Sequence, residues 1–166
     1  MPRTSAVALA LGLGLATAAG CARRTAAPRT LNAALILLPH DTVPIHASAS
    51  AHPCATGAGM LFVGIDGGVG VLAWTSADKA LASGDYPILT RGDTTTRRGA
   101  KASVRFMSGA AGRGVTLDSG TVTLTLGDRV GARVRGSGLE PAAGRRAMLD
   151  AEFRPVPLAR DSVACQ

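Results

Sequence analysis

The chain has 166 residues with 18 basic and 11 acidic side chains, a formal net charge of +7, and only one Trp, one Tyr and three Phe. Four of the arginines lie within the first 30 residues, so residues 31–166 carry a formal charge of only +3. Surfaces that bind single-stranded nucleic acid interleave basic side chains with stacking aromatic rings, which are scarce here. We therefore expect no nucleic-acid partner.

The first 20 residues follow the order of a secretory signal. One positive residue, Arg3, precedes an apolar segment from about Ala6 to Ala16, and small residues follow it. The apolar segment is shorter than the roughly 20 residues that span a membrane. We therefore predict that residues 1–20 are a signal peptide and that the mature protein is exported.

The end of this signal offers two cleavage sites. Residues Ala18-Ala19-Gly20-Cys21 resemble the lipobox of bacterial lipoproteins. The resemblance implies that Cys21 receives a diacylglyceryl group, with palmitate among the expected acyl chains, and anchors the mature chain in a membrane of the cell envelope. The alternative is cleavage after Ala16-Thr17-Ala18, which would release a soluble secreted protein. In the first case residues 21–30, which are polar, basic and contain proline, form a flexible tether.

The cysteine count favours the lipid-anchored alternative. The chain has three cysteines, and an odd number in an exported protein leaves one thiol to explain. If Cys21 carries lipid, Cys54 and Cys165 remain as one pair. We predict a disulfide between them, which an oxidising compartment allows and which closes a loop of about 110 residues, worth roughly 4 to 5 kcal/mol on the chain-entropy model.

From Leu31 onward, apolar and polar residues alternate with a period of two, and Gly, Asp, Ser and Pro interrupt them at short intervals. This pattern predicts a single all-β domain over residues 31–166 with about nine strands. We expect an antiparallel β-sandwich, with a small β-barrel as the alternative. One or two helical turns are expected over residues 76–84, with Ser76 as the N-cap and Gly84 as the stop. Further strands are expected at Leu31–Leu38, Val43–Ala47, Tyr86–Thr90 and Lys101–Met107.

Two hairpins give the clearest local patterns. Residues 59–76 form two apolar runs joined at Asp66-Gly67, a pair that tolerates the positive φ of a tight turn. Residues 121–136 alternate Val, Leu or Ala with Thr or Arg, so one face is apolar and the other polar. The arm over residues 145–155 follows, and it places Asp150 and Glu152 opposite the arginines at 133 and 135.

All three histidines, His40, His46 and His52, fall within thirteen residues. On an extended strand His46, Ser48, Ser50 and His52 share one face, so a Ser and His pair is one interpretation. A metal site is another, but His46 and His52 would lie about 20 Å apart, too far to share one ion. We interpret the segment as a solvated edge that leads into the disulfide, and we expect no metal and no cofactor.

A group of basic residues lies around a predicted loop and the strand that follows it. If they gather on one edge, they form a contact for a polyanion such as an acidic glycan or a lipid phosphate; the alternative is a solvated basic loop. These residues are Arg97, Arg98, Lys101 and Arg105, with Arg113 in the loop that follows the strand.

Together these patterns predict an exported, lipid-anchored cell-envelope protein with a non-catalytic binding or structural β-domain. Its expected partners are the membrane, through the lipid on Cys21, and an envelope glycan, lipid or protein. An alternative is a small β-barrel that binds an apolar ligand, with Trp74 lining a cavity. A secreted hydrolase that uses His46 or His52 is a third hypothesis.

Overall fold

Ten β-strands and no helix make up the part of the chain that the computed structural model describes, residues 30–65, 68–93 and 95–165. This confirms the all-β class. Residues 1–29, with the predicted signal, Cys21 and most of the tether, lie outside the described residues. The strands are β1 (Leu31–Leu37), β2 (Asp41–Ala47), β3 (Ala49–Pro53), β4 (Gly59–Gly64), β5 (Val69–Trp74), β6 (Gly84–Pro87), β7 (Gly99–Ser108), β8 (Ala111–Thr125), β9 (Val130–Glu140) and β10 (Arg145–Val156).

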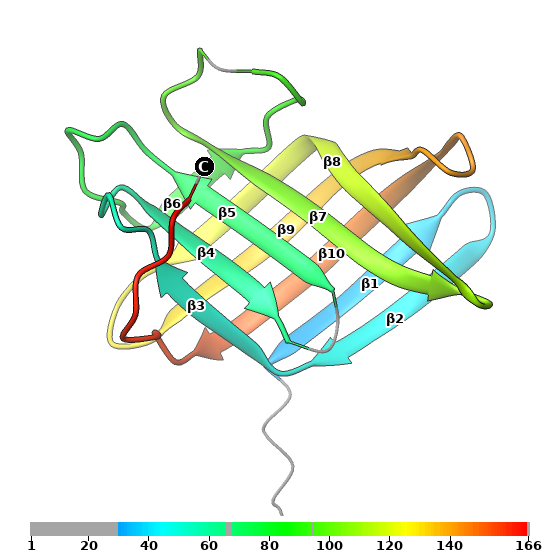
Figure 1. Ribbon diagram of the computed structural model, residues 1–166, viewed down its shortest axis with the longest axis horizontal. Helices are drawn as coiled ribbons and strands as arrows, with labels where there is room; N and C mark the ends of the chain where they lie inside the picture. The colour runs from blue at the N-terminus through cyan, green and yellow to red at the C-terminus, as the bar shows by residue number, and fades with distance from the viewer. Residues whose placement is uncertain (1–29, 66–67, 94, 166) are drawn as a thin grey trace, which may run out of the picture.

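The strands form one antiparallel sheet in the order β2-β1-β10-β9-β8-β7-β5-β4-β3, with β6 paired to β8. The two strands at the ends of this order, β2 and β3, are consecutive in the chain and only Ser48 separates them. One extended segment therefore pairs with β1 in its first half and with β4 in its second half. This nearly closes the sheet into the barrel shape that Figure 1 shows. Of the two predicted architectures, the structure has the barrel.

Side chains from all sides of the barrel fill its interior. The inward positions alternate along each strand, as in Leu31, Ala33, Leu35 and Leu37 of β1, which are all buried. Many inward positions carry Ala or Val, because a narrow barrel leaves little room on its axis. Larger rings occupy the middle, where the centroids of Phe62 and Phe153 lie 5.6 Å apart. The interior is thus a packed core.

The predicted hairpins are present with the expected register. Strands β4 and β5 pair with each other, and their turn at Asp66-Gly67 lies outside the described residues. In β9 and β10, Arg135 lies opposite Asp150 and Arg133 opposite Glu152. Both arginines approach the Asp150 carboxylate to 3.4 Å. This register confirms which face of each strand is polar.

The helical turns predicted over residues 76–84 are wrong. Residues 76–83 form turns, bends and irregular backbone, Gly84 already begins β6, and the backbone N–H of Lys79 donates to the carbonyl of Ser76. Most of these residues are exposed, so the segment has no apolar face to bury against the sheet. Short helices need such packing, because their own hydrogen bonds hardly repay the cost of nucleation.

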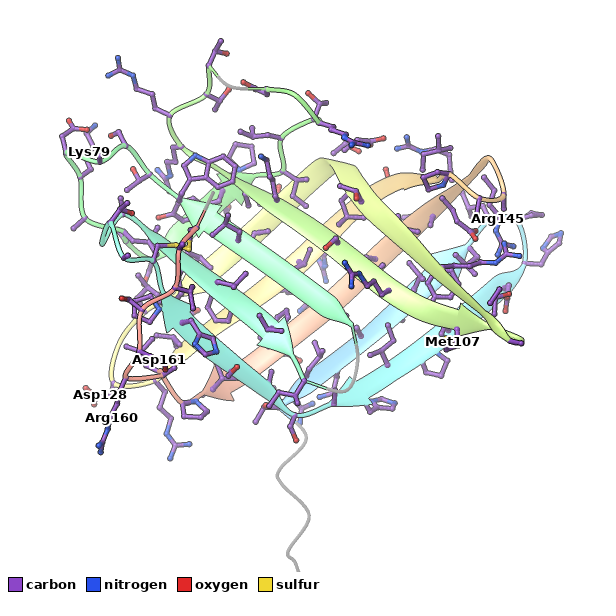
Figure 2. The ribbon with its side chains drawn as sticks, viewed as in Figure 1. Lys79, Met107, Asp128, Arg145, Arg160 and Asp161 are labelled. Atoms are coloured by element: carbon purple, nitrogen blue, oxygen red, sulfur yellow. A yellow bond between two sulfur atoms is a disulfide. The ribbon has the colours of Figure 1, made fainter. Side chains whose placement is uncertain are left out.

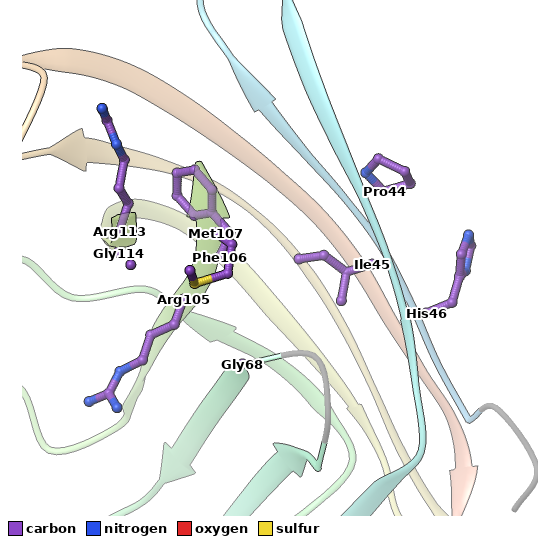
Figure 3. A pocket seen from close by; sticks show the side chains of 10 residues that line it. Pro44, Ile45, His46, Gly68, Arg105, Phe106, Met107, Arg113 and Gly114 are labelled. Carbon is purple, nitrogen blue, oxygen red and sulfur yellow. The ribbon is translucent and has the colours of Figure 1, made fainter. Parts of the chain in front are cut away.

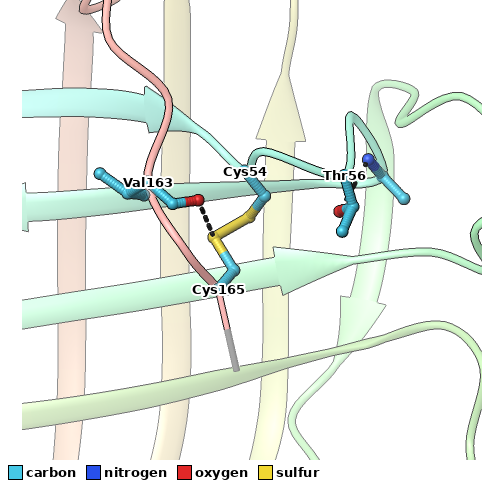
Figure 4. The surroundings of a disulfide bond; sticks show 5 residues. Cys54, Thr56, Val163 and Cys165 are labelled. Atoms are coloured by element: carbon cyan, nitrogen blue, oxygen red, sulfur yellow. Dashed lines mark hydrogen bonds between the residues drawn. A yellow bond between two sulfur atoms is a disulfide. The ribbon is translucent and has the colours of Figure 1, made fainter.

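The C-terminal segment, residues 157–165, runs beside β3 and covers its outer edge. The N–H of Ala159 donates to the carbonyl of Ala51, and the N–H of Val163 donates to the carbonyl of Pro53. The predicted disulfide between Cys54 and Cys165 is confirmed and fastens the end of this segment, as Figure 4 shows. An exposed strand edge invites pairing with other chains, and this segment prevents it at β3.

Candidate functional site

A gap in the barrel wall opens where the β4–β5 hairpin ends early. The pairing of β4 with β3 stops at Gly64 and Ala49, and the pairing of β5 with β7 stops at Val69 and Val104. Beyond these points β2 and the end of β7 face each other, with no strand between them among the described residues. A cleft of about 690 Å³ occupies this gap (Figure 3).

Apolar side chains from both edges form the floor of this cleft, which we call the wall cleft. Ile45 points from β2 toward the β7–β8 hairpin, where Phe106 lies on the inner face (Figure 3). Both side chains are buried, whereas Met107 at the rim is 65% exposed. Figure 2 places Met107 at the tip of the hairpin. The cleft thus combines a buried apolar floor with an accessible rim.

The ionisable groups that border the wall cleft are basic. Arg113 lies on the inner face of β8 directly opposite Phe106, and Arg105 lies on the outer face of β7. His46 also borders the cleft, but its side chain points away from it (Figure 3), and its Nδ1 lies 3.0 Å from Asn32 Oδ1. No Asp or Glu is among the lining residues. The cleft therefore favours a ligand with negative charge.

A buried carboxylate fixes the position of Arg113. The Nη1 of Arg113 donates to Oε1 of Glu140 at 2.8 Å, and Nε of Arg145 donates to Oε2 at 2.6 Å. The Glu140 side chain is fully buried, while the two arginines are about one third exposed. The hydrogen bonds from Arg113 and then Arg145 lower the pKa of Glu140 below its usual 4.5, although burial alone would raise it. The three groups together carry one net positive charge.

The edge of β2 that faces the wall cleft resists pairing with another strand. The carbonyl of Ser48 accepts a hydrogen bond from Ile65 on the β4 side. Because backbone groups alternate along a strand, the backbone of His46 and Pro44 faces the same side, toward the cleft. Pro44 has no N–H to donate, which is a common protection of strand edges. This favours a small molecule over an extended peptide as the occupant.

The predicted polyanion residues do not gather in one place. The guanidinium of Arg98 lies 4.4 Å from the centre of the Tyr86 ring and donates to the carbonyl of Asp85, and Arg97 borders the same loop cavity. Lys101 lies on the outer face of β7, 5.7 Å from the centre of the Trp74 ring. Arg105 lies four residues further along that face, roughly 13 Å away. Of the predicted basic residues, Arg105 and Arg113 border the wall cleft.

Trp74 does not face the interior of the barrel. It lies on the outer face of β5, next to Lys101, and borders a cavity of about 250 Å³ beside the disulfide. The inward positions of β5 are Val69, Val71 and Ala73. The cavity that Trp74 lines therefore lies on the outer wall and not inside the barrel.

The predicted histidines divide between surface and hydrogen-bonded positions. His40 lies exposed in the turn between β1 and β2. In β3, Ser50 Oγ and His52 Nε2 lie 2.9 Å apart, as their shared face predicts, and the exposed Asp161 lies 4.0 Å from His52 Nδ1. Figure 2 places Asp161 at the end of the barrel away from Arg145 and Met107.

Acyl transfer needs more than a nucleophile and a base, and the arrangement around Ser50 and His52 lacks the other parts. An oxyanion hole requires N–H donors beside the nucleophile. The N–H of Ala51 already donates to the carbonyl of Pro157, and β3 is paired with β4 on its other edge. His52 Nδ1 makes no hydrogen bond within the described part of the chain. Of a Ser–His–Asp set, the structure thus holds the Ser50–His52 contact and a longer approach of Asp161 to His52.

No further chemistry comes from metal-binding clusters. Among the residues that the structure describes, no three His, Cys, Asp or Glu side chains are grouped so that they could hold a metal ion. In the same residues no helix has the length and apolar character to cross a membrane.

Comparison of the chain with family models, with curated proteins and with solved structures finds no match. The fold and the wall cleft define a class: a barrel-shaped β-domain with a cationic, apolar opening in its wall. The function must therefore be argued from this site.

Proposed function

We propose that this is an exported, lipid-anchored cell-envelope protein whose barrel binds a small ligand in the wall cleft without catalysis. The ligand has an apolar part and a negative charge. The observation that carries this proposal is the composition of the cleft, which joins the buried floor of Ile45 and Phe106 to Arg113 and Arg105 and includes no carboxylate. Its volume of about 690 Å³ lies within the usual range for ligand pockets.

Binding rather than catalysis follows from the groups that border the cleft. The arginines stay protonated and so do not act as general bases at neutral pH. The imidazole of His46 points out of the cleft and contacts Asn32 (Figure 3). The Ser50 and His52 pair lies on β3 and does not border the wall cleft. The site therefore supplies shape, apolar contact and charge.

Export and anchoring rest on the sequence and on the disulfide. The signal-like residues 1–20 and the lipobox-like Cys21 support attachment to a membrane of the envelope. The Cys54–Cys165 disulfide supports an oxidising compartment, because such bonds are rare in the cytosol. The membrane is then the nearest source of amphipathic ligands.

We expect ligand binding to be weakened when the mouth of the wall cleft is covered. Gly112 pairs with Met107 on the outer face at the rim, and a Cβ added there would meet only the Met107 sulfur at 4.0 Å, so Gly112→Trp places a ring over the opening without backbone strain. The probe is 1-anilinonaphthalene-8-sulfonate, which is apolar and negatively charged. Its fluorescence should rise with the wild-type protein, and Gly112→Trp should weaken its binding at least tenfold.

The matched control is Met148→Trp, because Met148 lies exposed on the outer wall and away from the cleft. This variant should bind the probe like the wild type. Ile45→Trp, which fills the floor, should repeat the effect of Gly112→Trp if its melting curve shows that it folds. Equal binding by wild type and Gly112→Trp, or no binding by the wild type, would contradict the proposed cleft.

The anchor is tested separately by the intact mass of the protein from the host membrane fraction. We expect the mass of residues 21–166 plus a lipid, with two cysteines that react with an alkylating agent only after reduction. An unlipidated chain that begins near Ala19 would instead show a soluble secreted protein. That result would leave the binding proposal in place and remove the anchor.

A further inference from the structure

We infer that the ligand of the wall cleft is a single-chain fatty acid, whose carboxylate is bound by Arg113, with Glu140 as a positioning residue. This inference rests on the proposed function and names the chemical class of its ligand. It is carried by the geometry of Arg113, by the charge of its surroundings and by the apolar side chains next to it.

Arg113 is held in place and still has donors to offer. A guanidinium has five N–H groups, and one of them donates to Glu140 at 2.8 Å. Glu140 is itself fixed from the other side by Arg145 and is fully buried, so it has little freedom to turn. The Arg113 side chain is 30% exposed and borders the wall cleft, so a ligand can reach it from solvent. Such a fixed guanidinium binds a carboxylate with two parallel hydrogen bonds.

The net charge around Arg113 favours a ligand that carries one negative charge. Arg113, Glu140 and Arg145 together carry one net positive charge, because two guanidinium groups share one carboxylate. A carboxylate ligand neutralises this charge, whereas a phosphate dianion would leave an excess negative charge on the inner side of the cleft. Arg105 lies on the outer face of β7 and so does not add to this inner charge.

An apolar chain has a place directly beside the charged group. Arg113 and Phe106 are cross-strand partners, so their Cβ atoms lie about 5 Å apart on the inner face. Ile45 faces them from β2 across the gap (Figure 3). The Arg113 guanidinium extends from there toward Glu140 on β9, so a carboxylate bound to it would lay its chain along the Arg113 stem before the chain contacts Phe106 and Ile45 (Figure 3). The protected edge at Pro44 excludes the alternative of an added peptide strand.

The test compares palmitate with 1-hexadecanol, which has the same chain length and no charge, by isothermal titration with the full mature protein. We expect Arg113→Gln to weaken palmitate binding about 10- to 100-fold, because hydrogen bonds to charged groups contribute about 1.5 to 3 kcal/mol. Binding of 1-hexadecanol should stay within twofold of the wild type. The control Arg154→Gln removes an exposed arginine of β10 and should change neither affinity.

Glu140 is tested by the same pair of ligands under conditions in which the variant is folded. Glu140→Gln frees Arg113 but also raises the local net charge to +2, which by itself would favour the carboxylate. We expect the lost positioning to dominate, so this variant should weaken palmitate and not 1-hexadecanol, and Glu140→Asp should restore part of the palmitate affinity. A purely structural role would weaken both ligands together and would overturn the positioning role.

Three outcomes overturn the fatty-acid inference. Equal affinity of wild type and Arg113→Gln for palmitate would remove the role of Arg113. Binding of the naphthalene sulfonate without binding of palmitate would show that the cleft accepts another ligand class, and the proposed function would stand. Failure of the sulfonate as well would reject the proposed function itself.

Discussion

Replacement of Glu140 by Gln is expected to lower the free energy of unfolding by about 3 kcal/mol. The carboxylate is fully buried and holds Arg113 and Arg145 at 2.8 and 2.6 Å. Without its charge, the two guanidinium groups repel each other at the end of the barrel. We place the loss at the lower end of the range for a broken buried ion pair, because both arginines are partly exposed and water screens them. Urea denaturation at pH 7 measures this effect.

The pH dependence of the stability difference between wild type and Glu140→Gln shows whether the charge of Glu140 causes it. Because the pKa of Glu140 is lower in the folded than in the unfolded chain, its carboxylate stabilises the fold above the unfolded value near 4.5. This contribution is lost as the pH falls through the folded pKa. The gap between wild type and Glu140→Gln should therefore be constant above about pH 5.5 and shrink below pH 4.5.

Other carboxylates with lowered pKa values do not disturb this comparison. Hydrogen bonds from Thr96 and Thr95 lower the pKa of Asp93 to about 2, and Arg146 lowers the pKa of Asp118. Both groups are present in wild type and variant, so their effects cancel in the difference. A gap that stays constant down to pH 3 would contradict the ionic explanation.

Loss of the Cys54–Cys165 disulfide is expected to lower the free energy of unfolding by about 4 to 5 kcal/mol. The bond joins residues 111 positions apart, and the chain-entropy model predicts a cost of this size for so long a loop. Urea denaturation of the double variant Cys54→Ala, Cys165→Ala measures the effect. In addition the segment over residues 157–165 would be held to β3 only by its hydrogen bonds.

The control is the wild type after reduction, which should unfold at the same urea concentration as the double variant. If reduction shifts the midpoint much less than the substitutions do, the loss comes from altered packing around Cys54, which is buried, rather than from the missing bond. A loss below 1 kcal/mol in both experiments would contradict the structural importance of the bond.

Part of the candidate site could be predicted by extending the alternation that defines the strands. In β9 the inward residues Val130, Ala132 and Val134 have even numbers. If this alternation continues, Glu140 also points inward. In β10 the inward positions continue back to Arg145, which lies opposite Glu140. The pair could therefore be predicted from the sequence. The contact between this pair and Arg113 could not be predicted. The inward positions of β8 have odd numbers near Arg113 and even numbers from Val122 onward, so one alternation does not describe the whole strand.

The reason is an irregularity in the middle of β8. The register with β9 shifts between Leu117 and Ser119, so inward positions change from odd to even numbers along the strand. Gly120, with φ +124, follows this shift, and a Cβ there would lie 2.1 Å from the Arg135 carbonyl. Such β-bulges depend on how neighbouring strands meet and leave no clear pattern in one strand alone.

The sequence by itself determined the all-β class, the faces of the strands apart from the first half of β8, the β9–β10 register and the disulfide. The first three follow from the alternation of side chains, which needs only a few neighbouring residues, and the disulfide follows from the cysteine count of the whole chain. Neither depends on the shape of the folded domain. Only the tertiary structure decided between sandwich and barrel, because inward positions alternate in the same way in both. It also decided the site: the wall cleft exists because the β4–β5 hairpin is shorter than β7 and than the continuous β2–β3 segment, and that difference matters only once the sheet curves and brings β2 to face β7.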